Sequence, residues 1–274
     1  MIVLLRFALI GLLIYGVIVL AVYLGQRSMQ YFPDRDLGDP KLPEALQASV
    51  LKIKTEDGLE NIAWFSPPAD KTAKVFIHFH GNGGNISHRA ANAAFYQKLG
   101  YGFFLCEYRG YGGNPGKPTE QGLYHDARAC VNYLLDNGYR LDQLVFYGES
   151  IGSGVAVQMA LEFQPRRLVL EAPFSSAADV AKSAYGFLPV DMMMLDRFDS
   201  IDKITGIKTS LLVIHGTNDR VVPYRLGKKL FDKAKHPKEF IAVEGGGHSN
   251  LYDFKVGPKV VEWLERPHNQ GTPK

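Results

Sequence analysis

Cysteine is scarce in this chain, whose 274 residues contain only Cys106 and Cys130. Two cysteines cannot form the framework of disulfides that stabilises small secreted proteins. Cys106 lies in a predicted core strand and Cys130 on the apolar side of a predicted helix, which favours two small buried side chains. A single bridge between them stays open. The fold must therefore rest on a hydrophobic core, and an apolar content of 46% is enough for one.

Charge of one sign is also scarce, since the formal net charge is only +3. The basic residues are scattered and are not interleaved with aromatic residues, so nucleic acid is excluded as a partner. The glycine-rich segment at 81–84 is followed by Asn85 and lacks the lysine that a phosphate-binding loop requires.

One long apolar run stands at the N-terminus, from Ile2 to Leu24, with a single charge at Arg6. At about 1.5 Å per residue its last 18 residues span roughly 27 Å, close to the hydrocarbon thickness of a bilayer. A cleaved signal peptide and a buried core helix are the alternatives. No small-residue cleavage pattern follows the run, so we expect a single-pass membrane protein with an uncleaved anchor at residues 1–25. The basic residues on the two sides do not decide its orientation.

The rest of the chain divides into a polar, proline-containing juxtamembrane linker at 26–48, a domain at 49–266 and a tail at 267–274. An antiparallel hairpin opens the domain, and short apolar strands then alternate with helices. This alternation predicts an α/β fold, with a mostly parallel sheet of eight strands covered by helices on both faces. The expected strands are Val50–Lys54, Ile62–Phe65, Val75–His80, Tyr101–Glu107, Leu144–Tyr147, Leu168–Leu170, Ser210–Ile214 and Phe240–Val243.

A serine between two glycines follows the central strand, in the sequence Gly148-Glu149-Ser150-Ile151-Gly152. A sharp strand-to-helix turn of this kind holds the serine in a strained conformation, and only glycine fits on either side of it. The hydroxyl then stands exposed at the N-terminus of a helix. The alternative is a plain glycine-rich surface turn, but the flanking strand and helix favour a nucleophile at Ser150.

Two further side chains follow later strands, where the carboxyl ends of a parallel sheet place ligands. Asp219 follows the strand ending at Ile214, and His248 follows three glycines after the last strand. A neutral imidazole can accept the serine proton near pH 7. The chain order Ser150, Asp219, His248 is the order of the catalytic triad in α/β-hydrolases. Alternatively, Asp219 is a turn former and His248 a surface residue.

The loop His80–Asn85 follows another strand and precedes a helix. Its glycines leave backbone N–H groups free to point inward. We expect the backbone N–H groups of Asn82 and Ile151 to form an oxyanion hole. No metal or organic cofactor is needed for this chemistry.

A short apolar segment at 174–207, termed the lid below, is expected to cover the site. Phe187, Met193 and Met194 either contact an acyl chain or simply cap the core, and methionine is suited to both roles. Arg109 at a nearby strand end is expected to serve loop packing and a surface ion pair, and Glu149 to be a bystander.

These motifs together resemble the α/β-hydrolase superfamily, in particular a branch of small membrane-anchored serine hydrolases that includes protein-depalmitoylating thioesterases and related bacterial and fungal proteins. The resemblance rests on the N-terminal anchor and five motifs and covers nearly the whole chain. The motifs are HFHGNGGN at 78–85, YRGYGGNPGKPTE at 108–120, GESIGSG at 148–154, HGTNDRVVP at 215–223 and GGGH at 245–248. It implies Ser150 as nucleophile, His248 as base, Asp219 as its orienting acid and oxyanion donors near Asn82 and Ile151.

We therefore expect a membrane-anchored serine hydrolase that cleaves acyl esters or thioesters through an acyl-enzyme, with lipids among its candidate substrates. An acyltransferase and a peptidase could use the same triad. A non-catalytic scaffold that binds a lipid or a partner protein is disfavoured by the complete triad. A dehalogenase would need a carboxylate nucleophile where Ser150 stands.

Overall fold

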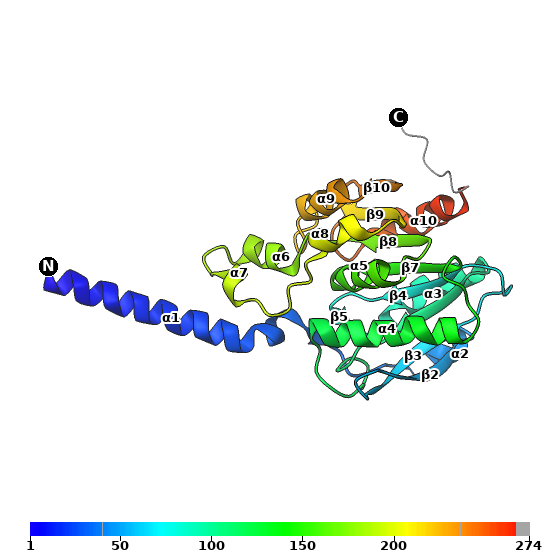
Figure 1. Cartoon of the computed structure of the whole chain (residues 1–274), viewed down its shortest axis with the longest axis horizontal. Coiled ribbons are helices and arrows are strands. Elements are labelled where there is room, and N and C mark those ends of the chain that lie inside the picture. Colours follow the sequence, from blue (N-terminus) through cyan, green and yellow to red (C-terminus); the bar gives the residue numbers. More distant parts are fainter. Residues whose placement is uncertain (40, 236, 267–274) are drawn as a thin grey trace.

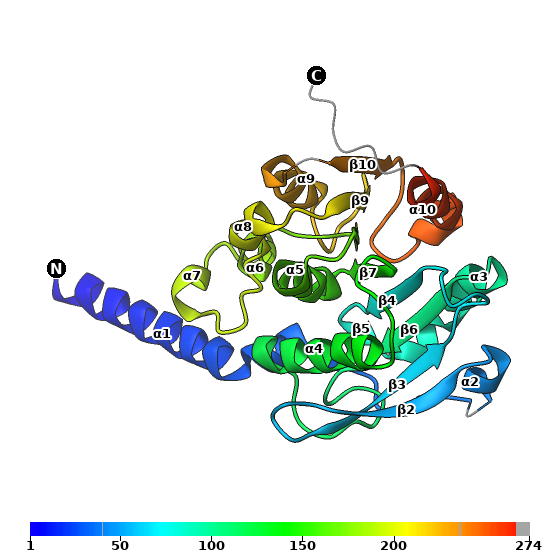
Figure 2. The ribbon, with the colours of Figure 1, turned by 45° about the vertical axis from the view of Figure 1, so that its right-hand side comes forward.

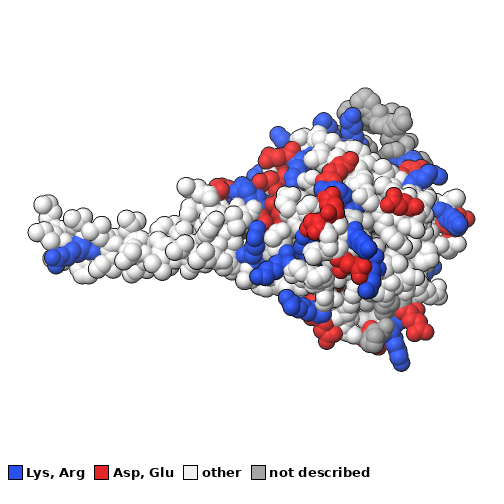
Figure 3. All heavy atoms as spheres, turned by 60° about the horizontal axis from the view of Figure 1, so that its bottom comes forward, with Lys and Arg blue, Asp and Glu red and all other residues white. Residues whose placement is uncertain are grey.

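The computed structural model describes residues 1–39, 41–235 and 237–266. A long helix, α1 (Ile2–Gln30), projects from one side of a rounded domain (Figure 1). Among the described residues, α1 is the one helix long and apolar enough to cross a membrane, and none of its strongly apolar part is buried in the protein. The space-filling view shows it white over most of its length, with charge concentrated on the domain (Figure 3).

The domain is built on one sheet, whose strands run in the order β10-β9-β8-β7-β4-β6-β3-β2. The first six are parallel, whereas β3 pairs antiparallel with β6 and β2. The prediction of an eight-stranded, mostly parallel sheet is thus confirmed within the described residues. The strands are β2 (Ser49–Lys54), β3 (Glu60–Ser66), β4 (Val75–Phe79), β6 (Gly102–Cys106), β7 (Leu144–Glu149), β8 (Arg167–Glu171), β9 (Ser210–Gly216) and β10 (Lys238–Val243).

Helices cover both faces of this sheet (Figures 1 and 2). One face carries α4 (Glu120–Asp136), α5 (Ile151–Phe163), α8 (Ser200–Lys203) and α9 (Tyr224–Lys233), and the other carries α3 (Ala90–Lys98) and α10 (Val256–Glu265). Two short helices are α2 (Leu42–Ala45) and the lid helix α7 (Val190–Met193), and the lid also contains α6 (Ala177–Ala184). The 3-10 turns are η1 (Ile86–Arg89), η2 (Ile204–Gly206) and η3 (Leu251–Phe254).

The core follows from the two-residue period of the strands. In β4, Val75, Ile77 and Phe79 join the core under α4 and α5, whereas Phe76 joins the core under α3 and α10. All four side chains are fully buried. A strand buried on both faces must be apolar almost throughout, which is why these runs were recognisable in the sequence.

The segment after α1 differs from the predicted linker. The helix continues to Gln30, and the chain then forms a two-residue strand, β1 (Phe32–Pro33), that pairs in parallel with β5 (Gly83–Gly84). Asp34 N adds a hydrogen bond of 3.2 Å to Gly84 O. The chain that follows the helix is therefore attached to the glycine-rich loop of the domain. The predicted tail at 267–274 lies outside the described residues.

The structure settles the question that the sequence left open about the cysteines. Cys106 in β6 and Cys130 in α4 are joined by a disulfide, with Cα atoms 6.4 Å apart. The bond links the sheet to a helix that covers it.

Candidate active site

Ser150 stands at the turn between β7 and α5 with φ of 52° and ψ of −118°. This conformation is unfavourable for a residue with a Cβ atom, and it lifts the hydroxyl out of the sheet. A Cβ on Gly152 would come within 2.0 Å of Phe79 O, and one on Gly148 within 2.5 Å of Gly152 O. The two glycines are thus required by the close approach of β4, β7 and α5.

Three predicted residues from distant parts of the chain meet at this turn. His248 Nε2 lies 2.9 Å from Ser150 Oγ, and His248 Nδ1 lies 2.8 Å from Asp219 Oδ2. The other carboxylate oxygen of Asp219 accepts hydrogen bonds from the backbone N–H groups of Val221 and Val222, at 2.9 and 2.8 Å. The carboxylate is therefore fixed in orientation, and its Oδ2 faces the imidazole of His248, with His215 Nε2 3.3 Å from the same oxygen.

The Asp219 side chain is fully buried, which by itself would raise the pKa of its carboxyl group. Hydrogen bonds with His215 and with His248 outweigh burial and hold the pKa below its ordinary value. His215 Nε2 also lies 3.0 Å from Val222 O. His215 is thus a structural residue that helps to hold the Asp219 carboxylate in its charged form beside His248.

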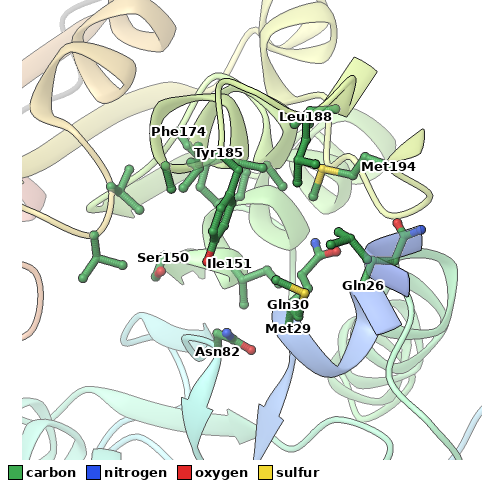
Figure 4. Close-up of a pocket in the computed structure, with 18 of the residues that line it drawn as sticks. Gln26, Met29, Gln30, Asn82, Ser150, Ile151, Phe174, Tyr185, Leu188 and Met194 are labelled. Carbon is green, nitrogen blue, oxygen red and sulfur yellow. The ribbon is translucent and has the colours of Figure 1, made fainter. Parts of the chain in front are cut away.

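Asn82 lies in the loop between β4 and β5 and lines the same pocket as Ser150 and Ile151 (Figure 4). Its side-chain Oδ1 accepts hydrogen bonds from Phe32 N at 3.2 Å and from Tyr111 Oη at 3.1 Å. The side chain of Asn82 is therefore held by Phe32 and Tyr111, and the N–H groups of Asn82 and Ile151 remain the expected oxyanion donors.

Two buried polar groups hold this loop from behind, and sequence reasoning missed both. His80 Nε2 lies 2.8 Å from Glu107 Oε1, while Glu107 Oε2 accepts from Ile86 N at 3.0 Å. Arg89 makes a bidentate ion pair with Glu149, at 2.8 and 3.0 Å, and its Nη1 donates to Gly83 O at 3.0 Å. Glu149 is thus part of the support of the glycine-rich loop rather than a bystander.

A second carboxyl group, Glu171 at the end of β8, is buried behind the serine. Ser150 N donates to Glu171 O at 2.9 Å, and the Tyr147 hydroxyl donates to the Glu171 side chain. Burial, together with the neighbouring negative charge of Glu149, raises the pKa of Glu171 to about 7. The side chain of Glu149 keeps a lowered pKa, because the adjacent Arg89 outweighs the effect of its own burial.

Ser150 opens into an apolar pocket of about 380 Å³. Phe174, Leu188 and Tyr185 of the lid form its roof in Figure 4, and Met29 and Gln30 of α1 form part of the opposite wall. None of the described residues that line this pocket is Asp, Glu, Lys, Arg or His. The pocket can therefore hold an apolar group beside the serine.

The lid residues selected from the sequence divide into two groups. Met193 and Met194 line the pocket. Phe187 is not among the lining residues and is 66% exposed. Arg109 was expected to form a surface ion pair, but its guanidinium is buried between Asp57 and Asp126, at 2.6 and 2.8 Å.

In the described part of the chain, no group of three or more His, Cys, Asp or Glu side chains is placed to hold a metal ion.

Comparison with known proteins places this arrangement in a family. Residues 70–195 match the family of serine aminopeptidases, S33. The uncharacterized protein Rv2307c of Mycobacterium tuberculosis is 36% identical over 259 residues, which cover 91% of this chain and 90% of that protein. The human alpha/beta hydrolase domain-containing protein 17B is 35% identical over 193 residues, which cover 67% of this chain and 62% of that protein.

A solved structure agrees with the fold. The esterase Pf2001 of Pyrococcus furiosus superimposes with a TM-score of 0.70 at 20% identity, covering 86% of this chain and 97% of that one. The match to the S33 family includes the glycine-rich loop and the turn at Ser150, and the similarity to the mycobacterial protein covers most of the chain. This chain therefore has the α/β-hydrolase fold, matches the S33 family over residues 70–195 and belongs to one family with the mycobacterial protein.

Proposed function

We propose that this protein is a membrane-anchored hydrolase of acyl esters or thioesters that works through Ser150, His248 and Asp219. The observation that carries the proposal is the continuous hydrogen-bonded series from Asp219 to Ser150 Oγ at the inner end of an apolar pocket. The series supplies an activated nucleophile, and the pocket supplies room for an acyl chain.

In the first half of the reaction, His248 Nε2 accepts the hydroxyl proton while Ser150 Oγ attacks the acyl carbonyl carbon. The negative charge that develops on the carbonyl oxygen is stabilised by the backbone N–H groups of Asn82 and Ile151. Loss of one such donor raises the barrier by about 3 kcal/mol in related chemistry. The imidazolium then gives its proton to the departing alcohol or thiol, which leaves an acyl group on Ser150.

In the second half, water enters and His248 removes one of its protons as the water oxygen attacks the acyl-enzyme. The carboxylic acid departs and Ser150 regains its proton. Asp219 keeps Nδ1 protonated throughout and stabilises the imidazolium by its charge. Its lowered pKa supports this role, because the carboxylate remains ionised at every pH at which His248 can act as a base.

The composition of the pocket favours acyl substrates over peptides with a free N-terminus. An aminopeptidase must bind a free ammonium group, for which a carboxylate is the ordinary partner. The described lining residues are apolar apart from amide, hydroxyl and phenol groups. This apolar lining instead supports a hydrocarbon chain as the group bound next to Ser150.

Retention of α1 as an anchor is supported by its contacts with the domain, which a removable leader has no need to make. Arg27 forms an ion pair of 2.8 Å with Asp196, whose side chain is 6% exposed. Asp196 also accepts a hydrogen bond from Glu120 N at 3.1 Å, so the pair connects α1 with both the lid and α4.

The proposal is tested by labelling the full-length protein with a short fluorophosphonate, which reacts quickly only with an activated serine. We expect labelling of wild-type protein and hydrolysis of p-nitrophenyl butyrate, and loss of both in Ser150→Ala, with unchanged circular dichroism. Undiminished turnover by Ser150→Ala would refute the assignment. Product analysis with added alcohol and amine acceptors separates hydrolysis from acyl transfer.

A further inference from the structure

Polar side chains on one side of α1 form hydrogen bonds with backbone groups of the lid. The Tyr15 hydroxyl donates to Phe187 O at 2.8 Å, and Gln26 Nε2 donates to Met193 O at 3.1 Å. In return, Gln26 Oε1 accepts from Leu195 N at 2.8 Å. Tyr15 and Gln26 are eleven residues apart and so lie on the same side of a helix of 3.6 residues per turn. The second half of α1 is thus aligned along the lid.

The same side of α1 reaches the pocket. Val19 and Val22 pack against the lid cluster that contains Leu188, Val190 and Met193. From α1, the pocket is lined by Val22, Gln26, Met29 and Gln30. In Figure 4, Ser150 lies at one end of the pocket, and Gln26 of α1 and Met194 of the lid lie at the other. The hydrophobic helix therefore forms a wall of the cavity that ends at the serine.

The lid presents an apolar tip beside α1. The side chains of Phe187, Met192 and Leu195 are 66%, 90% and 49% exposed. Such a cluster next to an apolar helix is typical of a surface that inserts into a membrane interface. The hydrogen bond from Tyr15 places Phe187 about halfway along α1, far from the end of the helix at the domain.

The length of α1 gives the depth that the tip of the lid would have in a bilayer. A hydrocarbon core of about 30 Å takes about 20 residues of helix. If it begins at Ile2, it ends near Val22, where the pocket begins. Tyr15 then lies roughly 10 Å inside the boundary, at about 1.5 Å per residue. Phe187 lies at the level of Tyr15, so the tip of the lid would be within the apolar part of the membrane.

From these contacts we infer that the pocket takes its acyl chain sideways from the bilayer, along the seam between α1 and the lid. In this arrangement α1 is both the anchor and a specificity-determining wall of the acyl site. The substrates are carboxylic esters or thioesters whose long chain stays in the membrane while the carbonyl reaches Ser150. The inference rests on the proposed hydrolase function and adds the substrate class to it.

The test uses full-length protein in phosphatidylcholine vesicles with the 4-methylumbelliferyl esters of butyrate and palmitate. Water cleaves either ester to the carboxylate and fluorescent 4-methylumbelliferone. In Val22→Trp the larger side chain on α1 fills part of the pocket and displaces two or three methylenes of a long acyl chain. Each buried methylene contributes about fourfold to the binding constant. We expect the palmitate-to-butyrate ratio of kcat/KM to fall by at least about tenfold. The matched control is Leu24→Trp, whose side chain is 75% exposed and does not line the pocket.

The outcomes distinguish failure of the proposed hydrolase function from failure of the α1 wall. If wild-type protein cleaves neither ester and resists the fluorophosphonate, the proposed function is wrong and this inference falls with it. If both esters are cleaved and Val22→Trp keeps the same ratio as Leu24→Trp, the hydrolase stands and the α1 wall is refuted.

A second measurement does not depend on catalysis. Phe187→Trp puts a fluorophore at the tip of the lid, and Val50→Trp puts one on exposed β2 at the other end of the domain. In vesicles of brominated phosphatidylcholine we expect contact quenching of the tryptophan at 187 and none of that at 50. Equal fluorescence of the two variants in brominated and ordinary vesicles would overturn the membrane-facing seam. The natural residues Trp64 and Trp263 are 2% and 5% exposed and supply a constant background.

Discussion

The ion pair between Arg89 and Glu149 gives a quantitative test of how the active site is supported. It joins Glu149, the residue before Ser150, to the glycine-rich loop, because Arg89 also donates to Gly83 O and, at 3.4 Å, to Asn85 O. The exposed fractions of the two side chains are 10% and 24%. Neither charge has full access to water once its partner is removed.

Breaking a buried ion pair by removing one partner costs about 3–5 kcal/mol, because the remaining charge stays buried without compensation. The partial exposure of Glu149 reduces this range, so we expect Glu149→Gln and Arg89→Met each to lower the free energy of unfolding by about 2–3 kcal/mol. The double variant buries no unpaired charge. Its loss should be smaller than the sum of the single losses by about 2 kcal/mol.

The measurement is urea unfolding of the four proteins, full-length and in detergent, combined with kcat for p-nitrophenyl butyrate. We expect Arg89→Met to reduce kcat more than Glu149→Gln does, since only Arg89 holds the loop carbonyls directly. Losses that add within about 0.5 kcal/mol would show that the two side chains do not act as a pair, and the reasoning would be refuted.

Three other predictions follow from the site. Asp219→Asn should lower kcat by about 10³–10⁴-fold at pH 7 while fluorescence-monitored stability changes little, because the amide favours the wrong imidazole tautomer; a loss below tenfold would contradict the role of Asp219. Glu171 has a raised pKa in the folded state, so its contribution to stability is full below about pH 4.5 and is lost as pH rises through about 7. Glu171→Gln should therefore gain stability relative to wild type between pH 5 and pH 8 in thermal unfolding, and parallel curves would count against the shift. Gly152→Ala should destabilise by at least about 1–3 kcal/mol through the contact with Phe79 O, whereas Gly83→Ala, whose Cβ meets nothing within 4 Å, should not; equal melting temperatures would exclude the steric argument.

The sheet could be predicted from the sequence because each strand is a buried apolar run between turn residues. Thr119, directly before the helix that begins at Glu120, is a residue type typical of an N-cap, and its side chain accepts a hydrogen bond from Gly122 N at 3.0 Å. Ser150, Asp219 and His248 were selected because each follows a strand. The structure brings them together, since parallel strands end at one edge of the sheet.

What could not be predicted depends on contacts between distant residues. The strand Phe32–Pro33 has only two residues and includes a proline, so it carries no periodic pattern. Arg89 and Glu149 are 60 positions apart, and the sequence around neither residue indicates that the two form an ion pair. The outward position of Phe187 follows from how the lid lies against α1, which an apolar segment does not encode by itself. Length and hydrophobicity likewise indicated a helix near residues 2–24 but not its continuation to Gln30.

The two residues of β1 have a mechanical consequence. Only Tyr31 separates the end of α1 from the strand that is bonded to Gly83 and Gly84, so there is no slack between helix and loop. Under the proposed anchoring, a change in helix tilt, such as a thinner or thicker bilayer imposes, would act on the loop directly. By these contacts α1 is more than an interchangeable tether. Replacing it with another apolar helix, or releasing the domain at residue 49, would also remove a wall of the pocket and the strand bonded to the glycine-rich loop.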